Sequence, residues 1–137
     1  MKERGSALVE TMLLGLVLIV PLIWALGVLS ELHRAALATT AAAREAGFDA
    51  ARAASPADAE RRVDAAVVAA LTDHGLDPRA AAVTASAAGL ERGSAVEVRV
   101  VYEVPVLQAP FLGSVGGPSI EVTATHVTRV DPYRSRP

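Results

Sequence analysis

The acidic residue with the clearest chemical purpose is Glu10, because it opens a long apolar run. The 20 residues from Thr11 to Ser30 carry no charge. As a helix they would span about 30 Å, at about 1.5 Å per residue, which matches the hydrocarbon core of a bilayer. A carboxylate at the centre of a membrane segment costs about 2.5–3.5 kcal/mol by insertion scales, and less near an end. The sequence therefore predicts that Glu10 has a partner or a specific role.

A second chemical feature lies just before this acid, at the Gly5–Ser6 peptide bond. Lys2 and Arg4 make the first residues basic. Glycine has no Cβ, so the backbone at Gly5 can extend into a tight protease cleft. Cleavage after Gly5 would leave Ser6 as the new amino terminus and Glu10 as the fifth residue of the mature chain.

Four interpretations of residues 1–30 compete. A secretory signal peptide has a basic start and an apolar stretch of about 7–15 residues, which is shorter than this run and has no place for Glu10. A plain signal anchor explains the length but gives Glu10 no role. A soluble core helix would need burial on every side, which a chain of 137 residues cannot provide. A prepilin-type leader, cut on the cytoplasmic side with its apolar stretch kept, accounts for Gly5, Ser6 and Glu10 together.

Residues 2–10, KERGSALVE, followed by an apolar helix, resemble type IV prepilins and pseudopilins. The layout of nearly the whole chain resembles the TadE-like pilus-assembly proteins of the tight-adherence (Flp pilus) system. Ser6 stands where many type II and type IV pilins have Phe, which disfavours an ordinary type II pseudopilin. Thr11 stands where many Flp-type pilins have Tyr.

This resemblance implies a set of partners and a role for the acid. The implied partners are a prepilin peptidase, pilin and other pseudopilin subunits, an inner-membrane assembly platform and membrane lipid. It also implies that Glu10 meets the amino terminus of a neighbouring subunit and so sets the registry between subunits.

These residues need a long helix to position them. We expect a leader over 1–5 and an N-terminal helix over 6–54 with its membrane span at about 8–30. Pro21 falls within the span, removes a backbone donor and should kink the helix. Lys2 and Arg4 favour a cytoplasmic amino terminus. The expected location is therefore the cytoplasmic (inner) membrane, single-pass, with the C-terminal domain extracytoplasmic.

Residues 55–131 are predicted to form a small extracytoplasmic α+β domain. Ser55 suits a helix N-cap and Pro56 the first helical position, while Gly75 suits the end of that helix. Alternating valines from Val96 to Val104 give the clearest strand pattern. Weaker alternation predicts strands near 81–87 and 120–130. The expected fold class is α+β: a long pilin-like transmembrane helix, then a second helix packed on a three-stranded, mostly antiparallel sheet. Residues 132–137 are expected to be a disordered tail.

Composition and motifs argue against several other functions. The chain has no cysteine, and its net charge of −2 gives no strong pull toward nucleic acid. His33, His74 and His126 lack metal-ligand spacing, and no nucleophile elbow or phosphate loop is present. We therefore expect no enzyme activity, no metal and no cofactor. The alternative function is an unprocessed single-pass membrane-anchored, or secreted, extracytoplasmic binding module.

Overall fold

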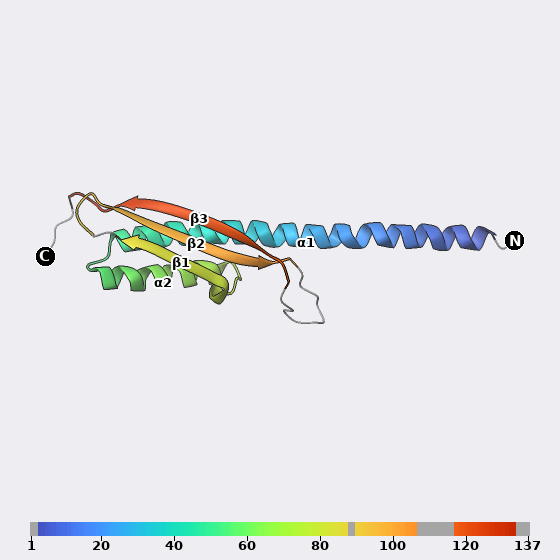
Figure 1. Ribbon diagram of the computed structural model, residues 1–137, viewed down its shortest axis with the longest axis horizontal. Helices are drawn as coiled ribbons and strands as arrows, with labels where there is room; N and C mark the ends of the chain where they lie inside the picture. Colours follow the sequence, from blue (N-terminus) through green and yellow to red (C-terminus); the bar gives the residue numbers. More distant parts are fainter. Residues whose placement is uncertain (1–2, 88–89, 107–116, 134–137) are drawn as a thin grey trace. The chain divides into compact units, whose positions relative to one another are not determined.

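A computed structural model describes residues 3–87, 90–106 and 117–133 of the chain (Figure 1). The chain divides into two compact units, Met1–Glu31 and Leu32–Pro137. Helix α1 (Glu3–Ala51) contributes its first part to one unit and its last part to the other. The second unit therefore begins well before residue 55, where the sequence pattern placed the start of the outer domain.

The N-terminal unit is the first part of α1. The helix begins three residues earlier than predicted, and it passes through Pro21 without a break in its helical assignment. The predicted kink at Pro21 stays a prediction. Large apolar side chains from Leu8 to Leu29 are exposed all around this unit, with Met12 at 74% and Trp24 at 46% exposure. A helix surface of this kind has no polar side to present to water.

The second unit holds a three-stranded antiparallel sheet in the order β1-β2-β3. Its strands are β1 (Ala81–Ala87), β2 (Ala95–Pro105) and β3 (Ser119–Arg129). Each pairs only with its neighbour in sequence. Together with helices α1 and α2 (Pro56–Asp73), and a short 3₁₀ turn η1 (Pro78–Ala80), this sheet confirms the predicted α+β class.

Strand β2 supplies the centre of the core through strict alternation. Every second residue is buried and its neighbours face outward, so one face of the sheet is covered and the other is open. The buried residues are Val96, Val98, Val100, Tyr102 and Val104. Pro105 is the last residue of this central strand, and just beyond it the Val106 N–H donates to the Pro118 carbonyl oxygen at 3.0 Å.

Two helices cover the buried face, whereas the sequence pattern predicted only α2. The buried stripe of α2 contains Val63, Val67 and Leu71. The last part of α1 adds a stripe of alanines that are almost fully buried, namely Ala35, Ala38, Ala42, Ala43, Ala46 and Ala50. Small side chains let this helix approach the sheet closely: a Cβ placed on Gly47 would lie 3.0 Å from the Cδ2 atom of His126 and the Oγ1 atom of Thr128.

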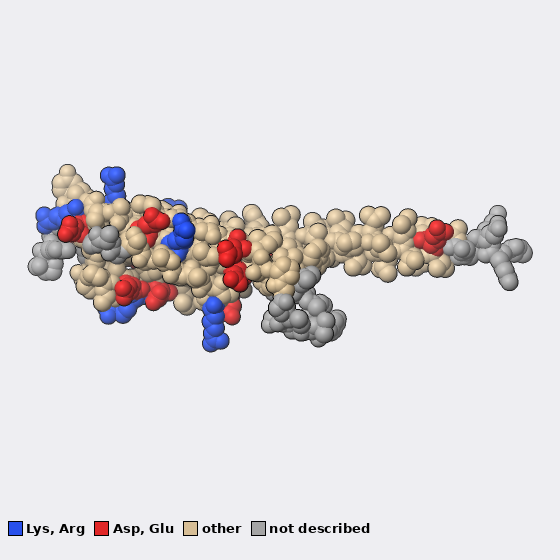
Figure 2. All heavy atoms as spheres, viewed as in Figure 1, with Lys and Arg blue, Asp and Glu red and all other residues tan. Residues whose placement is uncertain are grey.

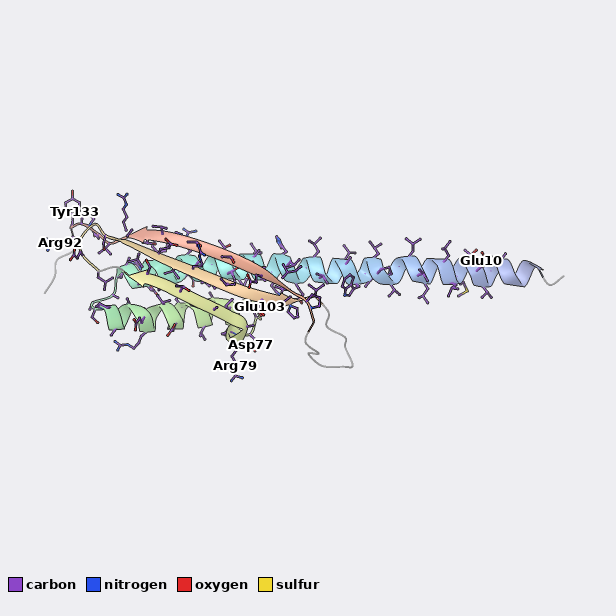
Figure 3. The ribbon with its side chains drawn as sticks, viewed as in Figure 1. Glu10, Asp77, Arg79, Arg92, Glu103 and Tyr133 are labelled. Atoms are coloured by element: carbon purple, nitrogen blue, oxygen red, sulfur yellow. The ribbon has the colours of Figure 1, made fainter. Side chains whose placement is uncertain are left out.

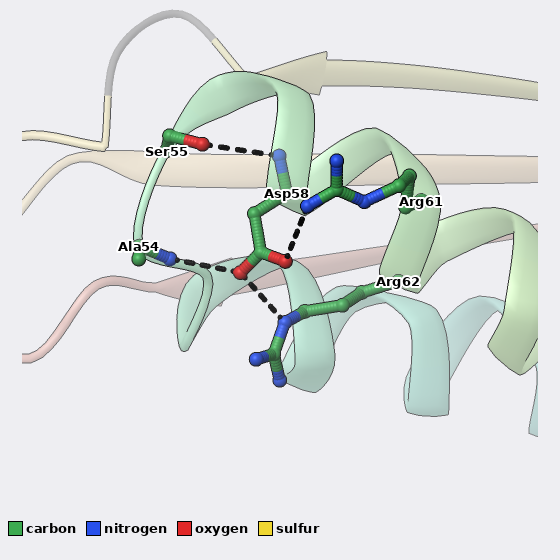
Figure 4. Close-up of polar contacts among 5 residues, drawn as sticks. All are labelled: Ala54, Ser55, Asp58, Arg61 and Arg62. Atoms are coloured by element: carbon green, nitrogen blue, oxygen red, sulfur yellow. Dashed lines mark hydrogen bonds and ion pairs between the residues drawn. The ribbon is translucent and has the colours of Figure 1, made fainter.

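Helix α2 begins as its sequence predicts. The Ser55 hydroxyl accepts a hydrogen bond from the Asp58 backbone N–H at 3.2 Å, and the Asp58 carboxylate accepts one from the Ala54 N–H at 3.1 Å (Figure 4). These bonds satisfy N–H groups that the helix itself leaves unpaired. The helix ends at Asp73 with His74 as its C-cap, and Gly75 follows with φ of +68°, a left-handed conformation that glycine adopts without strain.

Candidate functional site

The predicted processing site lies in the first turns of α1. The backbone of Gly5 and Ser6 is helical, and Glu10 follows four residues after Ser6. Four residues of helix rise about 6 Å, and residues i and i+4 lie on one face. The arrangement therefore places the Glu10 side chain on the same side of the helix as Ser6, about one turn away.

Glu10 projects from α1 with its side chain exposed (Figure 3). It makes no hydrogen bond or ion pair within the part of the chain that the structure describes. Its polar neighbour Thr11 donates from Oγ1 to the Ala7 carbonyl oxygen at 2.8 Å, so this hydroxyl is satisfied by its own helix. Among the described side chains of this region, the Glu10 carboxylate is therefore available for a partner outside the chain.

The surroundings of Glu10 suit lipid better than water. Among the described residues one helix is long and apolar enough to cross a membrane, namely α1 from Ala7 onward, and its most apolar stretch is not buried. Figure 2 shows this half of α1 as an uncharged surface with one isolated acidic side chain. A single-pass membrane segment is thus consistent with both length and composition, as the sequence predicted.

Two of the three histidines, His74 and His126, make contacts within the second unit, whereas His33 is exposed on α1. His74 places its Nδ1 atom 2.9 Å from the Ala70 carbonyl oxygen at the end of α2. His126 is half-buried and its ring lies 5.4 Å from that of Phe48, centroid to centroid. No group of three metal-ligating side chains occurs in the described ranges.

Two open grooves flank Phe48 in the second unit. One, of about 390 Å³, is lined by Glu45, Asp49 and Arg52; the other, of about 370 Å³, is lined on its far side by Arg129 and Asp131. Charged side chains of both signs line each groove. If the protein is a binding module, as in the alternative function, these grooves are the candidate ligand sites.

The open face of the sheet carries a charge arrangement that the sequence pattern did not reveal. Glu103 and Glu121 stand directly opposite each other on β2 and β3. Two like charges in this position repel. Arg79 is exposed just before β1 (Figure 3). The signal was hidden because strand alternation shows which face a residue occupies but not which residue lies opposite.

No family model, curated protein or solved structure matches this chain. The functional argument therefore rests on the residues and their placement.

Proposed function

We propose that the protein is a membrane-anchored, pseudopilin-like component of a Flp or tight-adherence type pilus, or of a related secretion filament. It acts in assembly, initiation or anchoring of that filament. The observation that carries this proposal is Glu10: an exposed carboxylate, unpaired within the described chain, on a helix whose following 20 residues are uncharged.

The first step of the proposed pathway is removal of residues 1–5 by a prepilin peptidase. The scissile bond lies near the start of α1, where backbone N–H groups have no partner within the helix. Unwinding this turn to admit a protease therefore breaks few hydrogen bonds. The helix that follows stays in the cytoplasmic membrane, and the second unit lies outside.

The second step is lateral association. Cleavage creates an ammonium group on Ser6, and the Glu10 carboxylate of a neighbouring pilin or pseudopilin binds it. The ion pair removes an unpaired charge from an apolar environment and sets the axial offset between helices. Van der Waals packing of the apolar side chains supplies attraction along the rest of the span.

Processing is tested by the mass of the protein extracted from membranes of cells that contain a prepilin peptidase. The expected mature chain begins at Ser6, and Gly5→Leu should block the cut because a bulky side chain cannot take the place of glycine. A mature chain that begins downstream of Ala25 would contradict the proposal and indicate a secretory signal.

The role of Glu10 is tested by comparing Glu10→Ala, Glu10→Asp and the neighbouring control Thr11→Ala. Removing the carboxylate lowers the cost of insertion, so membrane levels should hold while cross-links to pilin subunits and surface pili fall severalfold. Glu10→Asp should keep part of the activity, and Thr11→Ala should keep nearly all of it. Normal pili in the Glu10→Ala strain would overturn the proposed role.

A further inference from the structure

The sheet of the second unit has two strand edges without a neighbouring strand among the described residues, one on β1 and one on β3. Such an edge presents unpaired backbone N–H and C=O groups. β3 contains no proline, and no Asp, Glu, Lys or Arg stands at its inward positions 122, 124, 126 and 128. It therefore lacks two of the features that prevent a strand from pairing at an edge, namely proline and an inward-pointing charge.

The edge of β1 has uncovered apolar surface beside it. Val83 is half-buried and Ala85 exposed, although both are on the face that is fully buried in β2. Helices pack about 8–10 Å apart, whereas strands lie about 4.8 Å apart, so two helices can cover about four strands. This sheet has three, and Figure 1 shows α2 alongside β1. A fourth strand beyond β1 would complete the layer.

Charge distinguishes the two edges. Glu121 on β3 faces Glu103 across the sheet, so its charge is not compensated there. Arg79 makes no ion pair within the described ranges. Because Ala81 pairs with Tyr102, the preceding turn reaches the level of Glu103 and Glu121. Arg79 at the β1 edge has no ion-pair partner among the described residues, and Glu121 on β3 has no compensating charge. The two residues therefore lie at about the same level along the strands, one at each edge of the sheet.

We propose that β3 of one copy of this chain adds to the β1 edge of a second copy, in parallel. In one row of the sheet Thr84, Arg99 and Thr125 are neighbours. Continuing that row straight into the next copy brings its Thr125 beside Thr84, and its Glu121 to the level of Ala80, next to Arg79.

The strand directions fit this contact. β1 and β3 are each antiparallel to β2, so they run the same way, and β3 runs in the same direction as the domain part of α1 (Figure 1). Parallel pairing gives the domain part of α1 the same direction in both copies. Two copies inserted in the same orientation in one membrane require this. Pairing of two β3 edges antiparallel would reverse it. This step rests on the anchoring role of α1 in the proposed function, and a contact between two different edges repeats from copy to copy, as a closed ring or an open filament.

Cysteine cross-linking tests the contact, because the natural chain has no cysteine. The full chain with Thr84→Cys and Thr125→Cys is oxidised in its membrane. Within one chain these positions are two strands apart, about 10 Å, which is beyond disulfide reach. The expected product is a ladder of dimers, trimers and larger species. Only monomers, with the thiols open to alkylation, would overturn the proposal.

Single variants exclude other arrangements. A mixture of Thr84→Cys and Thr125→Cys chains should give dimers that contain one of each. Thr125→Cys alone should stay monomeric. Dimers from Thr125→Cys alone would show β3 paired with β3 and would overturn the proposed edge.

Charge reversal tests the predicted ion pair in the same cross-linking assay. Arg79→Glu should lower the ladder yield about twofold to fivefold, the effect of one exposed pair, and adding Glu121→Arg should restore it. The control Glu103→Gln removes the acidic neighbour of Glu121 but changes no residue of the proposed contact. Its ladder yield should equal that of the double-cysteine chain without a charge substitution. Equal yields from Arg79→Glu and the control would contradict the predicted register. Since the ladder does not depend on Glu10, normal pili in the Glu10→Ala strain would overturn the proposed function and leave this contact standing.

Discussion

Asp58 shows how one side chain organises the start of α2. Its carboxylate accepts hydrogen bonds from the Ala54 N–H, from Arg62 Nε at 2.8 Å and from Arg61 Nη2 at 3.3 Å. The bond from Ala54 is the largest cause of a lowered pKa at Asp58, and the bond from Arg62 is the next. Each of these contacts favours the charged form of the carboxyl group.

Asp58 should therefore make stability depend on pH at the acid end. A carboxyl group whose pKa is lowered by folding stabilises the fold above its unfolded pKa, and this contribution is lost as pH falls through the folded value. Below about pH 4, thermal unfolding followed by circular dichroism should lose less stability in Asp58→Asn than in the natural chain. Asp64→Asn, on the same helix, is the matched control and should keep the natural pH dependence. Equal acid profiles for all three would contradict this role of Asp58.

At the scale of single residues, the sequence predicts features that depend on neighbours along the chain. It does not predict which residues face each other across two strands. Ser55 and Pro56 predicted the start of α2 because a cap depends on residues close in sequence. The Glu103–Glu121 opposition depends on the register between β2 and β3. That register is set by the connection between the strands and by packing, and neither appears in the alternation of either strand.

At the scale of elements, the last part of α1 belongs to the core of the second unit as much as α2 does. Its contact surface is almost entirely alanine, with Thr39 as the buried polar exception. The Thr39 hydroxyl donates to the Ala35 carbonyl oxygen at 2.6 Å, so burial leaves it satisfied. Small side chains on this face let the helix approach the sheet closely, as Gly47 beside His126 and Thr128 shows.

Enlarging one of these alanines should therefore destabilise the second unit. Ala46 is fully buried whereas Ala36, on the same helix, is exposed. Ala46→Leu should lower the free energy of unfolding by about 1–3 kcal/mol through overpacking. Ala36→Leu should change it by no more than about 0.5 kcal/mol. Chemical denaturation of the full chain in detergent measures both, and equal effects would show that the alanine stripe is not tightly packed.

The same alanines explain why the sequence pattern missed this element. Alanine occurs on both faces of α1 from Ala35 to Ala51, so the buried stripe has no contrast in composition with the exposed side. In β2, charged residues such as Glu97 and Arg99 separate the valines, and the buried face is visible in the sequence. A pattern can predict a face only where the two sides differ in composition.

At the scale of the whole molecule, the two units differ in what they bury. The N-terminal unit exposes its large apolar side chains, whereas the second unit encloses a core of buried residues and carries charges of both signs on its surface. The first composition suits lipid and the second suits water. The N-terminal unit is therefore suited to a lipid environment and the second unit to an aqueous one.

The orientation of the chain is predicted by Lys2 and Arg4, which favour the cytoplasmic side. A phosphatase that is active only outside the cytoplasm, fused after Pro137, should be active. Its matched control is the same fusion with Lys2→Glu and Arg4→Glu, which should lower that activity. Signal only from a cytoplasmic reporter at Pro137 would reverse the assignment.

The alanine stripe of α1 also limits how this contact can change over generations. In ordinary cores Leu, Ile, Val and Met replace one another, because a larger side chain at one position is compensated by a smaller one beside it. At Ala42 or Ala46 only glycine is smaller, and it costs about 1 kcal/mol in a helix interior. Every other replacement adds atoms to a side chain that is fully buried, and at Gly47 even one Cβ would lie 3.0 Å from side-chain atoms of β3. No substitution at these positions is therefore conservative. Related chains that pack this helix against this sheet are expected to keep its small residues while the surrounding surface varies.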